Sequence, residues 1–103
     1  MMIWGLKTCD TCRKAKAALG VAELRDVRDK PLMANEIERL LGAFGDAAVN
    51  RKSATWRGLS AAERSSDPAT LLARHPALMK RPVIEDGDRL YLGWGEETQK
   101  ALL

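Results

Sequence analysis

The sequence predicts a single α/β domain in which helices flank a small mixed β-sheet. Three observations lead to this fold class: a short apolar strand runs into a loop with two cysteines and then a helix, a second strand follows, and a hairpin lies near the end of the chain. The 103 residues are 46% hydrophobic and 30% charged, which is typical of an ordinary globular domain. A chain of this length buries roughly two thirds of its unfolded surface and needs no disulfide scaffold.

The first thirty residues have the pattern strand, loop, helix, strand. The apolar segment 1–5 ends at a glycine and predicts a buried strand. A helix then follows up to a stop at Gly20, because apolar residues recur at helical spacing: Cys12, Ala15 and Leu19. Residues 21–27 form a weaker strand, with Val21 and Leu24 as its best apolar anchors. The result is a βαβ unit with the cysteines at its first turn.

The middle of the chain predicts helices. One apolar stripe consists of Ile37, Leu40, Leu41 and Phe44. We expect Asn35, with Glu38 three residues later, to open that helix and Gly45 to close it. Segment 46–58 shows no clean helical or strand periodicity of its apolar residues.

Two further helix starts follow in the sequence. Ser60 with Glu63 has the spacing of a capping box. Asp67 followed by Pro68 predicts a helix that runs to about His75, where Pro76 ends it.

The C-terminal segment predicts a hairpin and a last helix. Residues 83–85 and 88–92 read as two strands joined at Asp86-Gly87, a pair that tolerates the positive φ angles of a tight turn. Residues 96–103 close the chain as a helix, and we expect Trp94 to be a structural, half-buried residue.

Composition argues against several classes of function. The net charge of +3 is scattered, without the clustered basic stripe of a nucleic-acid-binding protein. No apolar run is long enough to span a bilayer, and the N-terminus does not resemble a signal peptide, so we expect a cytoplasmic protein without a membrane partner. Two cysteines and the single His75 are too few for a structural zinc site, so we expect no metal. We also expect a monomer.

The two cysteines, Cys9 and Cys12, are the candidate reactive groups. Cys9 precedes the helix, where unpaired N–H groups and the helix dipole favour an anion, and basic residues lie nearby: Lys7, Arg13 and Lys14. We therefore expect the pKa of the Cys9 thiol to fall below about 8.5, although Asp10 opposes the shift. Cys12 is either the resolving thiol or a small buried hydrophobe on the apolar face of its helix.

Two other positions have both a structural and a functional interpretation. Pro82, after Arg81, either forms a cis peptide bond or simply begins an edge strand. Arg51, beside Lys52, lies in the aperiodic segment, where an arginine is usually solvated.

Taken together, these motifs resemble the arsenate reductase/Spx/YffB family. The resemblance rests on segments 5–15, 50–57, 76–82 and 92–94, which occur in the family's order over nearly the whole chain. It implies a thioredoxin-like (glutaredoxin-like) fold, with residues 1–34 and 77–103 as its core. A helical insertion, residues 35–76, would separate its βαβ and ββα halves.

The resemblance also implies roles for individual residues. Cys9 matches the nucleophilic cysteine, Arg51 and Arg81 match two arginines that bind the oxyanion in glutathione-dependent arsenate reductases, and Pro82 matches the cis-proline beside the cysteine. Lys7 and Thr8, in the cysteine motif, fall on the substrate-binding side. Leu92 stands where the arsenate reductases carry a third arginine, which argues against arsenate as substrate.

Two functions follow as alternatives. The first is a thiol–disulfide or glutathione-dependent reductase without a bound cofactor, in which Cys12, glutathione or a glutaredoxin- or thioredoxin-type reductant completes the cycle. Arsenate reduction is the form of this activity that the family name implies, and it stays open as an alternative substrate. The second is a redox-sensing regulator like Spx, which binds the α subunit of RNA polymerase and not DNA directly.

Overall fold

The computed structural model describes residues 1–20 and 22–103. The chain forms two compact units: Met1–Lys30 with Arg81–Leu103, and Pro31–Lys80. The expected anchor Val21 lies outside the described residues. The proposed boundaries of core and insertion, 1–34, 35–76 and 77–103, stay a prediction.

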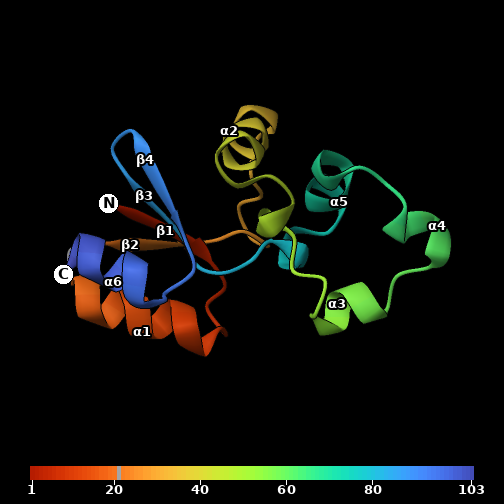
Figure 1. Ribbon diagram of the computed structural model, residues 1–103. Helices are drawn as coiled ribbons and strands as arrows, with labels where there is room; N and C mark the ends of the chain where they lie inside the picture. The colour runs from red at the N-terminus through yellow and green to blue at the C-terminus, as the bar shows by residue number, and fades with distance from the viewer. Residues whose placement is uncertain (21) are drawn as a thin grey trace. The chain divides into compact units, whose positions relative to one another are not determined.

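The first unit contains a mixed sheet of four strands in the order β2-β1-β3-β4 (Figure 1). The strands are β1 (Met2–Gly5), β2 (Glu23–Asp26), β3 (Val83–Asp86) and β4 (Arg89–Leu92). β1 runs parallel to β2 and antiparallel to β3, and β3 pairs antiparallel with β4. The parallel pair is joined through α1 (Asp10–Leu19), so the βαβ prediction is confirmed.

One apolar row crosses all four strands and forms the core of this unit. The pairing register places these residues side by side: Leu24, Ile3, Ile84 and Tyr91. The helices α1 and α6 (Glu96–Leu102) cover this face of the sheet (Figure 1). Side chains from α1 and the C-terminal segment fill the layer, among them Ala15, Leu19, Trp94 and Leu102. Trp94 is therefore a half-buried structural residue, as expected.

The hairpin turn lies one residue later than predicted. Asp86 pairs with Arg89, so the two loop residues are Gly87 and Asp88 and not Asp86-Gly87. Gly87 has φ +58°, the conformation that a glycine takes most easily at the first position of a two-residue hairpin loop. The glycine, and not the aspartate before it, fixes the place of the turn.

The second unit is built mainly of short helices. They are α2 (Ala34–Phe44), η1 (Gly45–Ala48), α3 (Ala54–Arg57), α4 (Ala61–Arg64), α5 (Pro68–Arg74) and η2 (Pro76–Leu78). α2 packs against α5, with Leu40 and Leu71 fully buried. Val49 and Met79 form an isolated antiparallel bridge that joins the middle of the unit to its C-terminal end.

Local capping explains where most of these helices begin. Ser60 and Glu63 form the predicted capping box of α4, and Asp67 caps α5. The predicted cap Asn35 is wrong: α2 begins after Met33, whose backbone N–H donates to the Glu36 carboxylate at 2.8 Å. The Glu36 carboxylate thus satisfies a backbone N–H at the start of a helix whose N-cap residue is apolar.

Candidate active site

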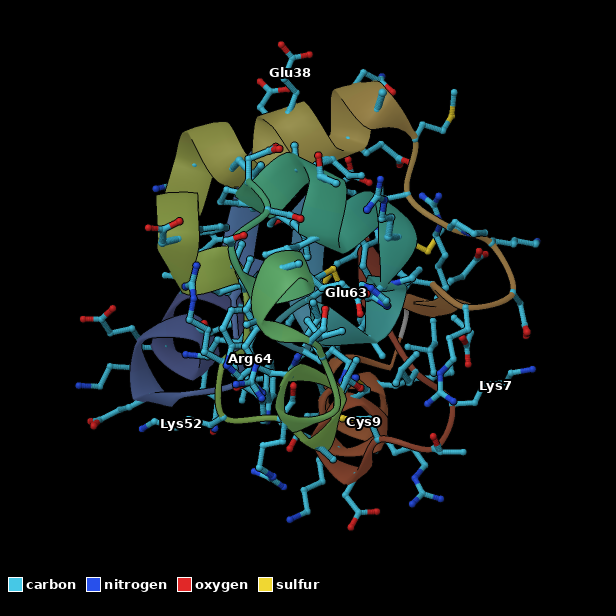
Figure 2. The ribbon with its side chains drawn as sticks, turned by 90° about the vertical axis from the view of Figure 1, so that its right-hand side faces the viewer. Lys7, Cys9, Glu38, Lys52, Glu63 and Arg64 are labelled. Carbon is cyan, nitrogen blue, oxygen red and sulfur yellow. The ribbon has the colours of Figure 1, made fainter. Side chains whose placement is uncertain are left out.

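The cysteine loop connects β1 to α1 and places Cys9 at the N-cap of the helix (Figure 2). The backbone of Cys9 is extended, with φ −87° and ψ 119°. Its N–H donates to the carbonyl of Leu6 at 3.0 Å, and its carbonyl accepts from the N–H of Arg13 at 3.0 Å. These bonds hold Cys9 at the helix start, where the sequence placed it, with its side chain partly exposed.

The pKa of the Cys9 thiol is lowered from its ordinary value. Partial burial is the largest single effect and raises it, whereas hydrogen bonds from the backbone N–H and the thiol of Cys12 lower it. The positive charge of Arg81 and the N–H of Thr11 lower the pKa further. The direction agrees with the expectation from the sequence, because the donors of the first helical turn stabilise the thiolate.

Cys12 behaves in the opposite way. Its side chain is fully buried, and burial raises the pKa of the thiol to about 12. An N–H donor at Leu6 and the charge of Arg81 lower the pKa, while the neighbouring Cys9 raises it. In the resting protein Cys12 is therefore a protonated thiol, which donates to the sulfur of Cys9.

Gly5 makes room for the sulfur of Cys12. A Cβ atom at position 5 would lie 2.4 Å from Sγ of Cys12, far inside van der Waals contact. The sequence shows Gly5 only as the end of a strand. The close approach between β1 and α1 that requires this glycine becomes visible in the three-dimensional structure.

The Arg81–Pro82 peptide bond is cis, which confirms the conformation expected for Pro82. Pro82 is buried, and its carbonyl accepts from the N–H of Gly93 at 2.7 Å. Gly93 has φ +82°, a conformation that favours glycine. The glycine after β4 therefore anchors the segment that carries Arg81, a role that the sequence did not indicate.

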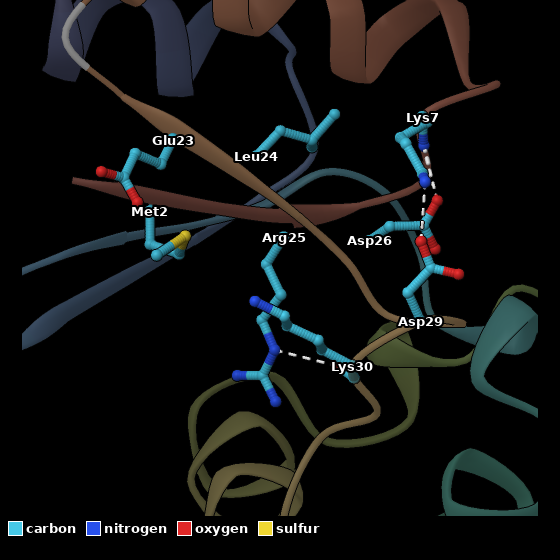
Figure 3. Close-up of a pocket in the computed structure, with 8 residues that line it drawn as sticks. All are labelled: Met2, Lys7, Glu23, Leu24, Arg25, Asp26, Asp29 and Lys30. Atoms are coloured by element: carbon cyan, nitrogen blue, oxygen red, sulfur yellow. Dashed lines mark hydrogen bonds and ion pairs between the residues drawn. The ribbon is translucent and has the colours of Figure 1, made fainter.

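Lys7 lies beside an acidic pair and not free beside the thiol (Figure 3). Its ammonium group is 2.7 Å from the Asp29 carboxylate, and its backbone N–H donates to Asp26 at 2.9 Å. The hydrogen bond and charge of Asp29 raise the pKa of Lys7. Lys7 lines a pocket of about 270 Å³ along β2, whereas Thr8 is exposed in the loop.

The positive charge around Cys9 therefore differs from the sequence expectation. Lys7 is paired with Asp29, and Arg13 forms an ion pair with Asp10. Both interactions neutralise charges that the sequence placed near the thiol. Arg81, which is 68 or more residues away in sequence from both, supplies the electrostatic stabilisation instead.

The candidate residues of the first unit are Lys7, Thr8, Cys9, Cys12, Arg81 and Pro82. Arg51 belongs to the second unit, and its contacts lie within that unit. Its guanidinium lies 5.3 Å from the centre of the Trp56 ring and 3.8 Å from the Asp46 carboxylate. Arg51 is thus held by local contacts and is not simply a solvated side chain.

Within residues 1–20 and 22–103, no group of three or more His, Cys, Asp or Glu side chains is arranged to hold a metal ion. None of the helices in the same part of the chain is long and apolar enough to cross a membrane.

Comparison with known proteins identifies the family. The ArsC family model matches residues 4–102. The chain belongs to the ArsC family. An uncharacterised protein of Haemophilus influenzae is 34% identical, and the match covers 96% of this chain and 95% of that protein.

Two further comparisons concern a transcriptional regulator and a solved structure. The global transcriptional regulator Spx of Bacillus subtilis is 30% identical over 93% of this chain and 81% of its own. The solved structure of the YFFB protein superposes with a TM-score of 0.90, at 27% identity, over 99% of this chain and 97% of that one. The thioredoxin-like fold of this ArsC-family protein is therefore confirmed.

Proposed function

We propose that this ArsC-family protein is a thiol-dependent oxidoreductase in which the Cys9 thiolate is the nucleophile. The observation that carries the proposal is the environment of Cys9. Its sulfur is partly exposed and accepts hydrogen bonds at a helix start, and its pKa is lowered. The thiolate is the species that attacks a disulfide, and a lowered pKa increases the fraction of Cys9 in that form.

We propose glutathione as the co-substrate. The Cys9 thiolate attacks the glutathione sulfur of a mixed disulfide, so a Cys9–glutathione disulfide forms and the substrate leaves as a thiolate that takes a proton from water. A second glutathione thiolate then attacks the glutathione sulfur on Cys9. Glutathione disulfide leaves and the Cys9 thiolate is regenerated, so each turnover oxidises one free glutathione thiol, while the other half of the glutathione disulfide comes from the mixed disulfide itself.

The environment of Cys12 favours glutathione over Cys12 as the resolving thiol. A thiol with a pKa of about 12 is almost entirely protonated at neutral pH, and the thiolate is the attacking form. Its burial also keeps it from solvent bases. In this mechanism Cys12 acts mainly as a hydrogen-bond donor that lowers the pKa of Cys9. A glutaredoxin- or thioredoxin-type protein could take the place of the second glutathione.

Several neighbouring residues have proposed supporting roles. Arg81 stabilises negative charge on Cys9 and on the attacked sulfur, and Pro82 fixes the segment that carries it. Arg51, together with Lys7 and Thr8, would contact the substrate, as the family resemblance implies. Leu92, on β4, offers no positive charge at the position of the third arginine, which favours a sulfur substrate over arsenate.

Steady-state turnover of the wild type and two cysteine variants tests the proposal. The assay follows glutathione-dependent reduction of a glutathionylated substrate, and separately of arsenate. We expect Cys9→Ser to abolish turnover and Cys12→Ser to retain it, with the wild type far more active on the sulfur substrate. Full activity of Cys9→Ser would refute the proposed nucleophile. Accumulation of a stable Cys12→Ser mixed disulfide in excess glutathione would instead make Cys12 the resolving thiol.

A redox-sensing regulator is the second candidate, because Spx is a relative over most of this chain and because Cys9 and Cys12 have the spacing of a redox pair. In this alternative, oxidation to a Cys9–Cys12 disulfide would alter binding to the α subunit of RNA polymerase. Pull-down of the α subunit by reduced and oxidised protein tests it. Redox-dependent binding without turnover would favour the regulator.

A further inference from the structure

The carboxylate of Asp26, at the end of β2, binds the start of the cysteine loop. Its Oδ2 accepts the backbone N–H of Lys7 at 2.9 Å, and its Oδ1 accepts the backbone N–H of Arg28 at 2.9 Å. The second bond closes a local turn, whereas the first reaches 19 residues back in the sequence. Figure 3 shows Asp26 beside Lys7, and both belong to the first unit. One side chain thus connects the end of β2 to the segment before Cys9.

The segment that Asp26 binds is a tight turn that ends at Cys9. The N–H of Cys9 donates to the carbonyl of Leu6 at 3.0 Å, so Lys7 and Thr8 are the two central residues of the turn. The closing bond of such a turn uses the N–H of the fourth residue and leaves that of the second available. In this protein the second N–H belongs to Lys7, and it donates to Asp26. The turn is therefore anchored to the neighbouring strand.

The position of this turn determines which groups the sulfur of Cys9 contacts. The N–H groups of Cys12 and Thr11 donate to that sulfur, and both belong to the first turn of α1. Hydrogen bonds weaken steeply when their geometry is lost. A turn without its anchor would therefore weaken the contacts that favour the Cys9 thiolate.

The side chain of Lys7 has a second attachment, which is weaker. Its ammonium group lies 2.7 Å from the Asp29 carboxylate, but the two side chains are 66% and 60% exposed, so solvent screens the pair. That contact holds the end of a flexible side chain. The bond to Asp26 acts on the backbone itself, and a hydrogen bond to an ionised acceptor is stronger than one between neutral groups. Donation from the Lys7 N–H is also the first cause of the lowered pKa of Asp26, which keeps the carboxylate ionised at neutral pH.

We propose that Asp26 is a positioning residue for Cys9, whose carboxylate holds turn 6–9 so that the sulfur stays against the N–H donors of α1. The inference rests on the proposed function, in which Cys9 is the reactive thiol. A purely structural role, the closing of the turn after β2, would change the stability of the protein and not the ionisation of Cys9. Simple electrostatics predicts the opposite sign. Loss of a nearby carboxylate would by itself lower the pKa of a thiol, whereas loss of the anchor raises it.

The pH dependence of iodoacetamide alkylation tests the proposal, because it reports the ionisation of Cys9 without turnover. The variants are Asp26→Ala, which has no acceptor, and Asp26→Asn, which has one neutral oxygen for two N–H groups. The matched control, Asp29→Asn, removes the same charge nearby but keeps both backbone bonds of Asp26. We expect alkylation at neutral pH to slow about threefold in Asp26→Ala and about twofold in Asp26→Asn, because the thiolate fraction falls. The control should react at least as fast as the wild type.

Circular dichroism shows which variants are folded under the assay conditions. An unchanged or lowered pKa of Cys9 in folded Asp26→Ala would refute the positioning role, even if that variant is less stable. If Asp26→Ala does not fold, the same result in Asp26→Asn refutes it. Equal slowing in Asp29→Asn would also refute it, because that variant keeps the anchor.

These outcomes are separate from the proposed function. Wild-type turnover with an unchanged pKa of Cys9 in the Asp26 variants would refute the positioning role and leave the oxidoreductase intact. A raised pKa in those variants of a protein without turnover would refute the oxidoreductase and leave the positioning role intact.

Discussion

Replacement of Gly5 by alanine is expected to destabilise the protein through its contact with Cys12. The new Cβ would lie 2.4 Å from Sγ and 3.2 Å from Cβ of Cys12, so the helix or the strand must shift. Extra atoms in a packed interior typically cost about 1–3 kcal/mol. In a domain of this size each kcal/mol changes Tm by about 4–8 °C, so we expect Gly5→Ala to lower Tm by at least about 4 °C.

Gly42→Ala is the matched control for thermal unfolding followed by circular dichroism. Gly42 lies inside α2, and a Cβ there would meet no atom within 4 Å. Alanine is more favourable than glycine in a helix by about 0.5–1 kcal/mol. The same chemical change should therefore raise Tm at position 42 and lower it at position 5.

A double-mutant cycle with Cys12→Ala decides whether the sulfur is the cause. The cycle compares the cost of Gly5→Ala in the wild type and in Cys12→Ala, where the clashing Sγ is absent. We expect most of the cost to disappear in the second background, which gives an interaction energy of about 1 kcal/mol or more. An equal cost in both backgrounds, or a Gly5→Ala protein as stable as the wild type, would refute the reasoning.

Three further predictions concern charge and capping. Cys12→Ala and Arg81→Gln should each raise the pKa of Cys9, because each substitution removes a group that lowers it. The pH dependence of iodoacetamide alkylation measures the shift. An unchanged alkylation profile would contradict the assignment. The raised pKa of Cys12 favours the folded state below the pKa of an unfolded cysteine, about 8.5, and this contribution is lost as pH rises towards about 12. Denaturant titrations at several alkaline pH values should therefore show a smaller loss in Cys12→Ala. Asp67→Ala removes the side-chain cap of α5 and should cost about 1 kcal/mol in urea unfolding, whereas Glu38→Ala, on the exposed face of α2, should cost almost nothing.

The elements that the sequence predicted well are those fixed by neighbouring residues. The strand 2–5, the helix that ends at Gly20 and the helix that starts at Pro68 all depend on short apolar patterns and local caps. Segment 46–58 showed no helical or strand periodicity because its backbone conformation depends on hydrogen bonds to residues far away in the sequence. Val49 pairs with Met79, 30 residues later, and the adjoining helices are only single turns. Such long-range pairing cannot be predicted from the pattern of neighbouring residues alone.

The same distinction applies to the candidate site. The N-cap position of Cys9 and its N–H donors are local, and the sequence predicted them together with a lowered pKa. The charges were less predictable, because proximity in sequence suggested Lys7, which the fold pairs with Asp29. The effective cation, Arg81, arrives with β3 from the far end of the chain.

The two cysteines show how the fold turns one kind of side chain into two chemical groups. They are three residues apart, yet Cys9 stands before the first turn of α1 and Cys12 faces inward from it against Gly5. The first position offers N–H donors and partial exposure, which favour the thiolate, while the second removes water, which favours the thiol. Each shift reinforces the other, because the protonated Cys12 donates to Cys9 and the charge on Cys9 opposes ionisation of Cys12. Formation of a disulfide on Cys9 removes that charge, but burial, the largest cause of the raised pKa of Cys12, remains, so Cys12 stays a protonated thiol and resolution falls to an external thiolate.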